Sequence, residues 1–302
     1  MPALAALHEL THVVGVVCQP DRPSGRGMKM HAPPVKQAAH ARGLDVHQPT
    51  KVRDGQLERW LRELALDVAL VAAYGRILPA GVLAVPRLGC VNLHASLLPA
   101  YRGAAPIQWA LLDGVTETGI SLMQMDEGMD TGAVFALRRL AIAPDVNGGQ
   151  LTSELAQLAA DVVRNEFLEV LGGRATAQPQ DDQRATLAPP IRSEHLAIDW
   201  RRPSRNVVNQ VRALAPTPGA YTFAGSRRLK LAAVRMGSSD QRGLPGEIVA
   251  GPSGVEVVCG EGTVELLRAT VAGKNEQSAR DLLNGRVLEL GQRLGGTPAD
   301  IP

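Results

Sequence analysis

The residues best suited to chemistry in this sequence are Asn92 and His94. They lie in an otherwise apolar run, Gly89 to Ala95, that predicts a buried strand. Side chains two positions apart on a strand share a face, so this pair projects together, with Cα atoms roughly 6–7 Å apart. An amide can donate to a developing oxyanion, and an imidazole can move a proton near neutral pH. The pair therefore predicts a reaction site, although two hydrogen-bonded core groups fit the same pattern.

An acidic loop, Met125–Gly132, offers carboxylates that could serve this site. For Asp126 and Glu127 we expect a solvated turn. Asp130 precedes Thr131-Gly132, where the chain re-enters the sheet, and we expect its side chain to point inward and orient His94. The expected catalytic set is therefore Asn92, His94 and Asp130.

Other reactive residues fit less well. Cys90 lies four strand positions from His94, about 13 Å away, which is too far for a nucleophile and its base. His8 and His12 have no third ligand nearby, so no metal site is expected. The three cysteines are far apart and odd in number, which fits a reducing compartment and a cytoplasmic location.

Elements of two kinds must position these residues. Apolar runs at His12–Val17 and Val68–Ala73 and at the strand of Asn92 alternate with helical patterns, which predicts an α/β fold with an open, mostly parallel sheet. We expect this catalytic domain to span residues 1–173, followed by a linker, 174–202, rich in Pro, Gln, Asp and Arg. Short strand-like runs separated by turns predict a small β-barrel over 203–302. No apolar run of about 20 residues is present, so no membrane association is expected.

Charge is distributed unevenly although the net charge is only +2. Eight basic residues and no acidic ones lie between Trp200 and Ser239. The Pro- and Gly-rich loop Arg22–Lys29 adds three more. Either stretch could be a solvated face, but two of them favour a nucleic-acid partner.

These residues together resemble the 10-formyltetrahydrofolate-dependent formyltransferases. The core resemblance rests on Asn92-x-His94 with Ser96-Leu97-Leu98-Pro99, and on Asp130 in its Asp-Thr-Gly setting. The branch that formylates methionyl-tRNA is matched by Arg102–Ile107, by Ala73-Tyr74-Gly75, by the basic loop and by Ser278–Gly285. The fold implied is a Rossmann-like sheet of the formyltransferase type with an OB-like C-terminal barrel.

The resemblance also implies substrates and sites. Formyl would pass from 10-formyltetrahydrofolate to the α-amino group of methionine on initiator tRNA, with no protein partner evident. Two groups of binding residues are implied. For the folate they are Tyr74, Gly75, Leu78, Pro79, Ser96, Leu97, Leu98 and Pro99; for tRNA they are Arg22, Arg26, Lys29, Arg227, Arg228 and Lys230.

Two features depart from the family pattern. Met28 stands where the family loop usually has Lys. Family members also begin with a strand and a Gly-Thr-Pro-type turn ahead of the helix that Ala3–Leu10 represents here. We therefore expect the strands at His12–Val17 and Val68–Ala73 to lack a neighbour, and the chain as written to be poorly soluble or inactive beside an upstream-extended form.

Two alternative functions stay open at this point. One is formylation of a small amine, such as an amino sugar nucleotide or a glycinamide ribonucleotide, which needs no basic loop or basic barrel. The other is RNA binding without catalysis, against which Asn92, His94 and Asp130 argue together.

Overall fold

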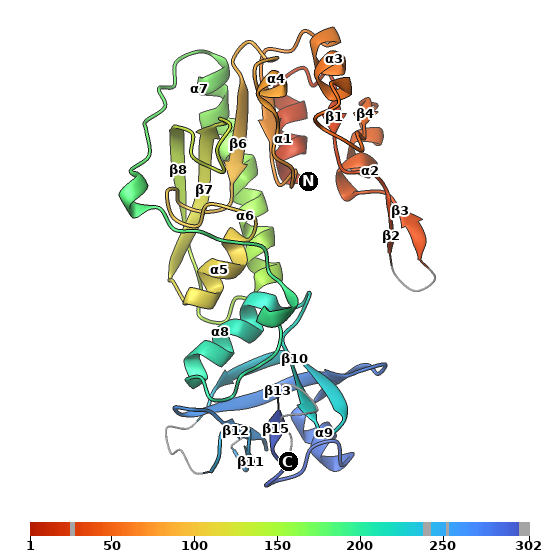
Figure 1. The fold of residues 1–302 in the computed structure, drawn as a ribbon, viewed down its shortest axis with the longest axis vertical. Coiled ribbons are helices and arrows are strands. Elements are labelled where there is room, and N and C mark those ends of the chain that lie inside the picture. The colour runs from red at the N-terminus through yellow and green to blue at the C-terminus, as the bar shows by residue number, and fades with distance from the viewer. Residues whose placement is uncertain (25–27, 238–242, 252–253, 296–302) are drawn as a thin grey trace. The chain divides into compact units, whose positions relative to one another are not determined.

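The computed structural model describes residues 1–24, 28–237, 243–251 and 254–295 (Figure 1). The chain divides into two compact units. One comprises Met1–Pro106, Glu117–Ala141 and Ser153–Pro189; the other comprises Ile107–Thr116, Ile142–Thr152 and Pro190–Pro302. No described helix is long and apolar enough to cross a bilayer.

The helices and strands of the described chain are numbered in chain order. They are α1 (Pro2–Leu10), β1 (Val16–Val17), β2 (Arg22–Ser24), β3 (Lys29–His31), α2 (Pro34–His40), β4 (Val46–His47), α3 (Gln56–Glu63), β5 (Ala69–Val71), α4 (Ala80–Leu83), β6 (Cys90–His94), α5 (Pro106–Asp113), β7 (Glu117–Gln124), β8 (Val134–Ala141), α6 (Gly148–Val162), a π-helical stretch (Val163–Phe167), α7 (Leu168–Leu171), α8 (Ser204–Leu214), β9 (Tyr221–Ala224), β10 (Arg227–Met236), β11 (Ile248–Val249), β12 (Glu256–Val258), β13 (Thr263–Val271), β14 (Glu276–Ser278), α9 (Ala279–Asn284) and β15 (Leu294–Gly295).

The main sheet of the first unit is mixed and has the order β5-β6-β7-β8. β5 and β6 are parallel, joined by a crossover through α4, whereas β6–β7 and β7–β8 are antiparallel. The predicted α/β class is confirmed, but the prediction of a mostly parallel sheet is wrong. The loop between β7 and β8 is too short for the crossover that parallel strands require, so these strands form a hairpin.

The strands β1 and β4 form a second, separate parallel pair. β1 pairs only with β4, and β5 pairs only with β6, so each has one edge without a strand neighbour in the described chain. Between them lies an apolar cavity of about 510 Å³, lined by both strands and by one face of α1. The expectation of a further strand beside them stays a prediction.

The second unit contains an antiparallel sheet with the path β11-β12-β13-β10-β9-β15, and β14 added to β13. Its inner face and α8 share one apolar core, in which Val207, Leu214, Leu229 and Leu266 are buried. Alternation along β9 and β10 produces this core, because every second residue faces inward. The antiparallel β domain is thereby confirmed. In the strand order, β11 and β15 are the two ends.

Candidate active site

Strand β6 carries the two predicted catalytic side chains and is buried along its whole length. It pairs with β5 on one side, where Asn92 lies opposite Val71, and with β7 on the other, where His94 lies opposite Ser121. Asn92 is 9% and His94 6% exposed. In the described chain the Asn92 amide makes no hydrogen bond to protein, so its donors are available to a ligand.

Both ring nitrogens of His94 face oxygen acceptors. Nε2 lies 2.9 Å from the carbonyl oxygen of Tyr101, and Nδ1 lies 3.5 Å from Oδ2 of Asp130. A carbonyl can only accept, so Nε2 carries a proton in this arrangement. The structure thus brings the expected catalytic residues Asn92, His94 and Asp130 into one cluster.

Asp130 is fixed by its own backbone and by its neighbours. Its φ is +56°, a left-handed conformation that Asp tolerates better than most residues. Its Oδ2 accepts a hydrogen bond from the backbone N–H of Gly103 at 2.8 Å. Its carboxylate therefore points inward, as expected, whereas Asp126 and Glu127 in the same loop are exposed.

Gln180, in the segment predicted as a plain linker, holds the loop of Asp130 in place. Its amide nitrogen donates to the carbonyls of Asp130, at 2.8 Å, and of Gly132, at 2.7 Å. Its Oε1 accepts in turn from the guanidinium of Arg102, which is 6% exposed and also pairs with Asp182 at 2.7 Å. A chain of polar contacts therefore runs from Asp182 through Arg102 and Gln180 to the loop of Asp130.

The same segment also binds the loop that follows β6. The backbone N–H of Arg102 donates to Thr186, and Ala188 donates back to the Arg102 carbonyl at 2.7 Å. Gly103 has φ +124°, and a Cβ there would lie 2.8 Å from the carbonyl oxygen of Ala188. A side chain at Gly103 would therefore force the two segments apart. Residues 178–188 therefore hold both the Asp130 loop and the loop that follows β6; we call this segment the strap.

The loop Ser96–Pro99, predicted to contact folate, is shaped from within. The Ser96 hydroxyl, which has no exposed surface, donates to the carbonyl of Ala100 at 2.6 Å. The Ser121 hydroxyl donates to the Ser96 carbonyl at 2.6 Å and accepts from the N–H of Leu98 at 2.9 Å. The hydroxyl of Ser96 is thus used in fixing the turn. Ser96 is therefore left with its backbone for contacting a ligand.

The second predicted folate segment, Tyr74–Pro79, leads from β5 into α4. The Tyr74 carbonyl accepts from the amide of Gln19, which also accepts from Arg76 at 3.1 Å. The Tyr74 ring belongs to an apolar cluster with Leu78, and its hydroxyl is buried without a hydrogen-bond partner in the described chain. Burial raises the pKa of this hydroxyl. Gly75 turns the chain with φ +73°.

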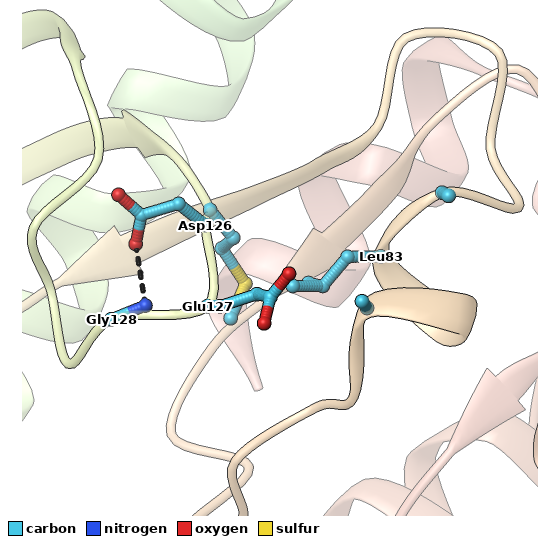
Figure 2. A pocket seen from close by; sticks show the side chains of 7 residues that line it. Leu83, Asp126, Glu127 and Gly128 are labelled. Carbon is cyan, nitrogen blue, oxygen red and sulfur yellow. Dashed lines mark hydrogen bonds between the residues drawn. The ribbon is translucent and has the colours of Figure 1, made fainter.

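A cleft of about 620 Å³ lies between α4 and the acidic loop (Figure 2). Its α4 wall is apolar and includes Leu83, and its loop wall includes Glu127 and Gly128. Asp126 turns back and accepts from the N–H of Gly128 at 3.0 Å, whereas Glu127 extends toward Leu83. The cleft therefore combines an apolar wall with the exposed carboxylate of Glu127, and the loop that forms it also carries Asp130.

Cys90 is ruled out as a nucleophile by its surroundings. It is 1% exposed and packs in the same apolar cluster as Leu78. Burial raises the pKa of its thiol to about 11, so the thiolate is scarce at neutral pH. Within the described chain no three His, Cys, Asp or Glu side chains gather as metal ligands would.

The predicted tRNA-binding residues lie in both units. Arg22 and Lys29 are exposed on the two strands of the β2–β3 hairpin, and Arg26 lies outside the described residues. The base of this hairpin is fixed through Asp21, which pairs with Lys36 at 2.9 Å and accepts from Gln48 at 2.7 Å. Those two hydrogen bonds hold the pKa of Asp21 below its usual value. Arg227, Arg228 and Lys230 lie on β10 in the second unit.

Comparisons with known proteins bear on this site. The formyl transferase family model matches residues 3–165, and the model of the formyl transferase C-terminal domain matches residues 190–287. The chain is 49% identical over 298 residues to the methionyl-tRNA formyltransferase of Sorangium cellulosum (strain So ce56), covering 98% of this chain and 96% of that protein. The chain belongs to the methionyl-tRNA formyltransferase family. The family member of Myxococcus xanthus (strain DK1622) is 47% identical over 294 residues, covering 96% of this chain and 93% of that protein.

Solved structures share the fold at low sequence identity. The methionyl-tRNA formyltransferase from Clostridium thermocellum superimposes with a TM-score of 0.54 and 20% identity, over 74% of this chain and 94% of that one. HypX from Aquifex aeolicus in complex with tetrahydrofolic acid gives a TM-score of 0.63 and 17% identity, over 91% of this chain and 48% of that one. These likenesses establish the formyltransferase fold.

Several supporting residues of this family member are not predicted by the sequence. Tyr101 supplies the acceptor for His94, and Gln180 and Arg102 hold the Asp130 loop. The sequence marks Arg102 only as part of a motif, and the polar composition of the strap predicts a linker. The high content of Gln, Asp and Arg in the strap is the feature of the sequence that could have indicated these contacts, because segments that bridge loops through polar side chains have this composition too.

Proposed function

We propose that this chain transfers the formyl group of 10-formyltetrahydrofolate to the α-amino group of methionine on initiator tRNA. The observation that carries the proposal is the cluster of Asn92, His94 and Asp130 in a chain matched along nearly its whole length by methionyl-tRNA formyltransferases. The cluster offers two donors and one carboxylate on a single face, which suits formyl transfer to an amine.

In the proposed reaction the neutral amine attacks the formyl carbon and forms a new C–N bond. The formyl oxygen becomes an oxyanion, which the Asn92 amide and a His94 N–H stabilise; one such donor contributes about 3–4 kcal/mol. The C–N bond to the folate then breaks, its nitrogen takes up a proton, and the attacking nitrogen loses one. Asp130 accepts that proton, directly or through water.

For this role the Nε2–H group of His94 has to change its hydrogen-bond acceptor. In the structure its Nε2–H donates to the Tyr101 carbonyl. We propose that the formyl oxygen takes over this donor when both substrates are bound, while Asp130 keeps the ring oriented from the Nδ1 side.

We propose that the folate ring enters the cleft between α4 and the acidic loop. The apolar α4 wall would take one ring face, and hydrogen-bonding groups of the loops would take its polar edge. Tyr74, Gly75, Leu78 and Pro79, which lead into α4, and Ser96, Leu97, Leu98 and Pro99, which follow β6, do not line this cleft. We propose that they contact the part of the folate outside it, with Ser96 acting through its backbone. This co-substrate is the only small molecule that the proposal requires.

For tRNA we propose two contacts: the hairpin that carries Arg22 and Lys29, together with Arg26 between them in the sequence, and the strand that carries Arg227, Arg228 and Lys230. We further propose the domain limits 1–173, 174–202 and 203–302. Closure of the C-terminal sheet into an OB-like barrel is part of the proposal. It is supported by a bridge between Glu247 and Arg293, beside β11 and β15.

A direct assay tests the function. The purified chain is supplied with 10-formyltetrahydrofolate and with methionyl initiator tRNA, an amino sugar nucleotide or glycinamide ribonucleotide in turn. Formyl transfer to the tRNA alone supports the proposal. Transfer to a small amine instead, or binding of tRNA without transfer, would assign one of the two alternative functions. Alanine variants of Arg22 and Lys29 should weaken use of charged tRNA.

A further inference from the structure

The outer face of strands β9 and β10 combines aromatic and cationic side chains. Along β9, Thr222 and Ala224 are buried, whereas Tyr221 and Phe223 face outward and are half-buried. The register pairs Phe223 with Arg228 and Tyr221 with Lys230, and residues directly opposite each other in a sheet share a face. We call Tyr221, Phe223, Arg228 and Lys230 the outer patch.

The aromatic content of the outer patch is unusual for this chain. The sequence has only three Phe, three Tyr and three Trp residues. Two of these nine rings lie on the outward face of one strand pair, away from the apolar core. Core packing therefore does not account for their position.

The patch is ordered for stacking. The guanidinium carbon of Arg228 lies 3.8 Å from the centroid of the Tyr221 ring, so the planar cation covers that ring. Phe223 meets Tyr221 edge-on, with ring centroids 5.8 Å apart and planes at 90°. A guanidinium that lies over one ring can stack on a further planar group with its other side, and nucleobases stack on such planes.

The two cations of the outer patch, Arg228 and Lys230, are also available to bind a phosphate. Nζ of Lys230 donates to the Pro216 carbonyl at 2.6 Å, which uses one of its three N–H donors. On this face of the neighbouring strands, Glu276 lies 3.3 Å from Arg268 and is paired with it, and Glu265 is paired with Arg235. Among the described residues no ion pair joins an acidic side chain to Arg228 or Lys230. Arg228 and Lys230 therefore retain their positive charge toward a ligand.

We infer that the outer patch binds unpaired nucleotides of the RNA substrate, with a base stacked over Arg228 and Tyr221 and its phosphate near Lys230. The inference rests on the proposed function for the identity of the RNA. It goes beyond the charge-based assignment of β10, because it requires a planar stack and an RNA element that is not helical. In a duplex the base faces are covered by neighbouring bases and cannot stack on protein.

Arg227 provides a matched control for Arg228. It is adjacent, has the same charge and is also exposed, but it pairs with Ala224 and belongs to the opposite face of the strand. If charge alone binds RNA, R227M and R228M weaken tRNA binding equally. If the stack binds RNA, R228M weakens binding about tenfold or more, as base stacking on one side chain implies. R227M then removes only the charge contact proposed for β10 and weakens binding less than about threefold.

The experiment measures binding of a fluorescent initiator tRNA transcript to the full chain, with a single-stranded RNA and a blunt RNA duplex as competitors. We expect Y221L and R228K to lose affinity as R228M does, Y221F to keep it, and the single-stranded RNA to compete better than the duplex. Thermal unfolding of each variant shows whether the sheet is intact. In formyl transfer the same variants should raise KM for tRNA and leave kcat at saturation unchanged.

Equal losses in R227M and R228M, full affinity in a folded Y221L, or stronger competition by the duplex would each overturn the inference. None of these results would contradict the proposed function, because that function is tested by formyl transfer in the unsubstituted chain. Failure of the unsubstituted chain to formylate methionyl-tRNA would instead overturn the proposed function, so the two failures are distinguishable.

Discussion

Strands β5 and β6 are neighbours in one sheet, yet they differ in burial and in the number of strands that pair with them. All five residues of β6 are buried, and it has a strand partner on each side. All three residues of β5 are only half-buried, although all three are apolar, and one of its edges faces the apolar cavity. Asn92 and His94, the proposed oxyanion donors, lie on the well-supported strand, and the proposed folate segment Tyr74–Pro79 follows the poorly supported one.

The difference teaches how this site is organised. The reacting groups depend on fixed positions, and β6, the strap and the Ser96–Pro99 turn supply them through many hydrogen bonds. The side-chain hydrogen bonds that hold the segment after β5 are those of Gln19 with the Tyr74 carbonyl and Arg76, and that of Arg76 with the Thr50 carbonyl. An unpaired backbone group at a buried edge costs on the order of 1–3 kcal/mol, so β5 should open more readily than β6.

The largest expected effect concerns the well-supported strand. Asn92→Ala or His94→Ala should lower kcat at least about a hundredfold, because each removes a donor to the oxyanion. Initial rates at saturating folate and charged tRNA measure this, and tRNA affinity should stay within about twofold. Unchanged turnover in either variant would remove that residue from the mechanism.

The strap should contribute less, through Asp130. Asp130→Asn should suppress turnover strongly, and Gln180→Ala should lower kcat by about ten- to thirtyfold, because a small displacement of a catalytic group costs up to a hundredfold. Gln180→Glu can still accept from Arg102 but cannot donate to the Asp130 carbonyl, so it should not restore activity. Normal kcat in both Gln180 variants would reduce the strap to a covering segment. A pH–rate profile that shifts in Gln180→Ala would separate positioning from simple loss of stability.

The two strands themselves can be compared by amide hydrogen exchange. The Ala69 N–H points to Gly89 on the β6 side, so alternation along the strand turns Leu70 toward the cavity edge. We expect the Leu70 amide to exchange at least about tenfold faster than those of Val91 and Leu93. Equal protection would mean that the unpaired edge of β5 does not weaken the strand.

The smallest effect is expected at Cys90, which lies where the two strands meet. Cys90→Ala should leave kcat within about twofold and lower thermal stability slightly, because the thiol only packs there. Iodoacetamide should modify Cys90 slowly at pH 8 in the folded protein, because the pKa of about 11 leaves little thiolate. Inactivation of Cys90→Ala without unfolding would give the thiol a role that its burial argues against.

Much of this protein is determined by its sequence alone. The alternation within Gly89–Ala95 places Asn92 and His94 on one face whatever surrounds them, because the period of a strand is local. The Asp-Thr-Gly setting marks Asp130, and the inner and outer faces of β9 and β10 follow from the same alternation. These patterns act over a few residues, so the order of the amino acids is enough to predict them.

Other features are decided only by the tertiary structure. The direction of β7 relative to β6, the gap between β1 and β5, and the role of Gln180 all depend on contacts between residues far apart in the chain. Polar composition cannot distinguish a free linker from a strap, because Gln and Arg suit water and buried carbonyls alike. Nor can an apolar run reveal whether both edges of its strand are paired, since pairing belongs to the neighbours and not to the strand.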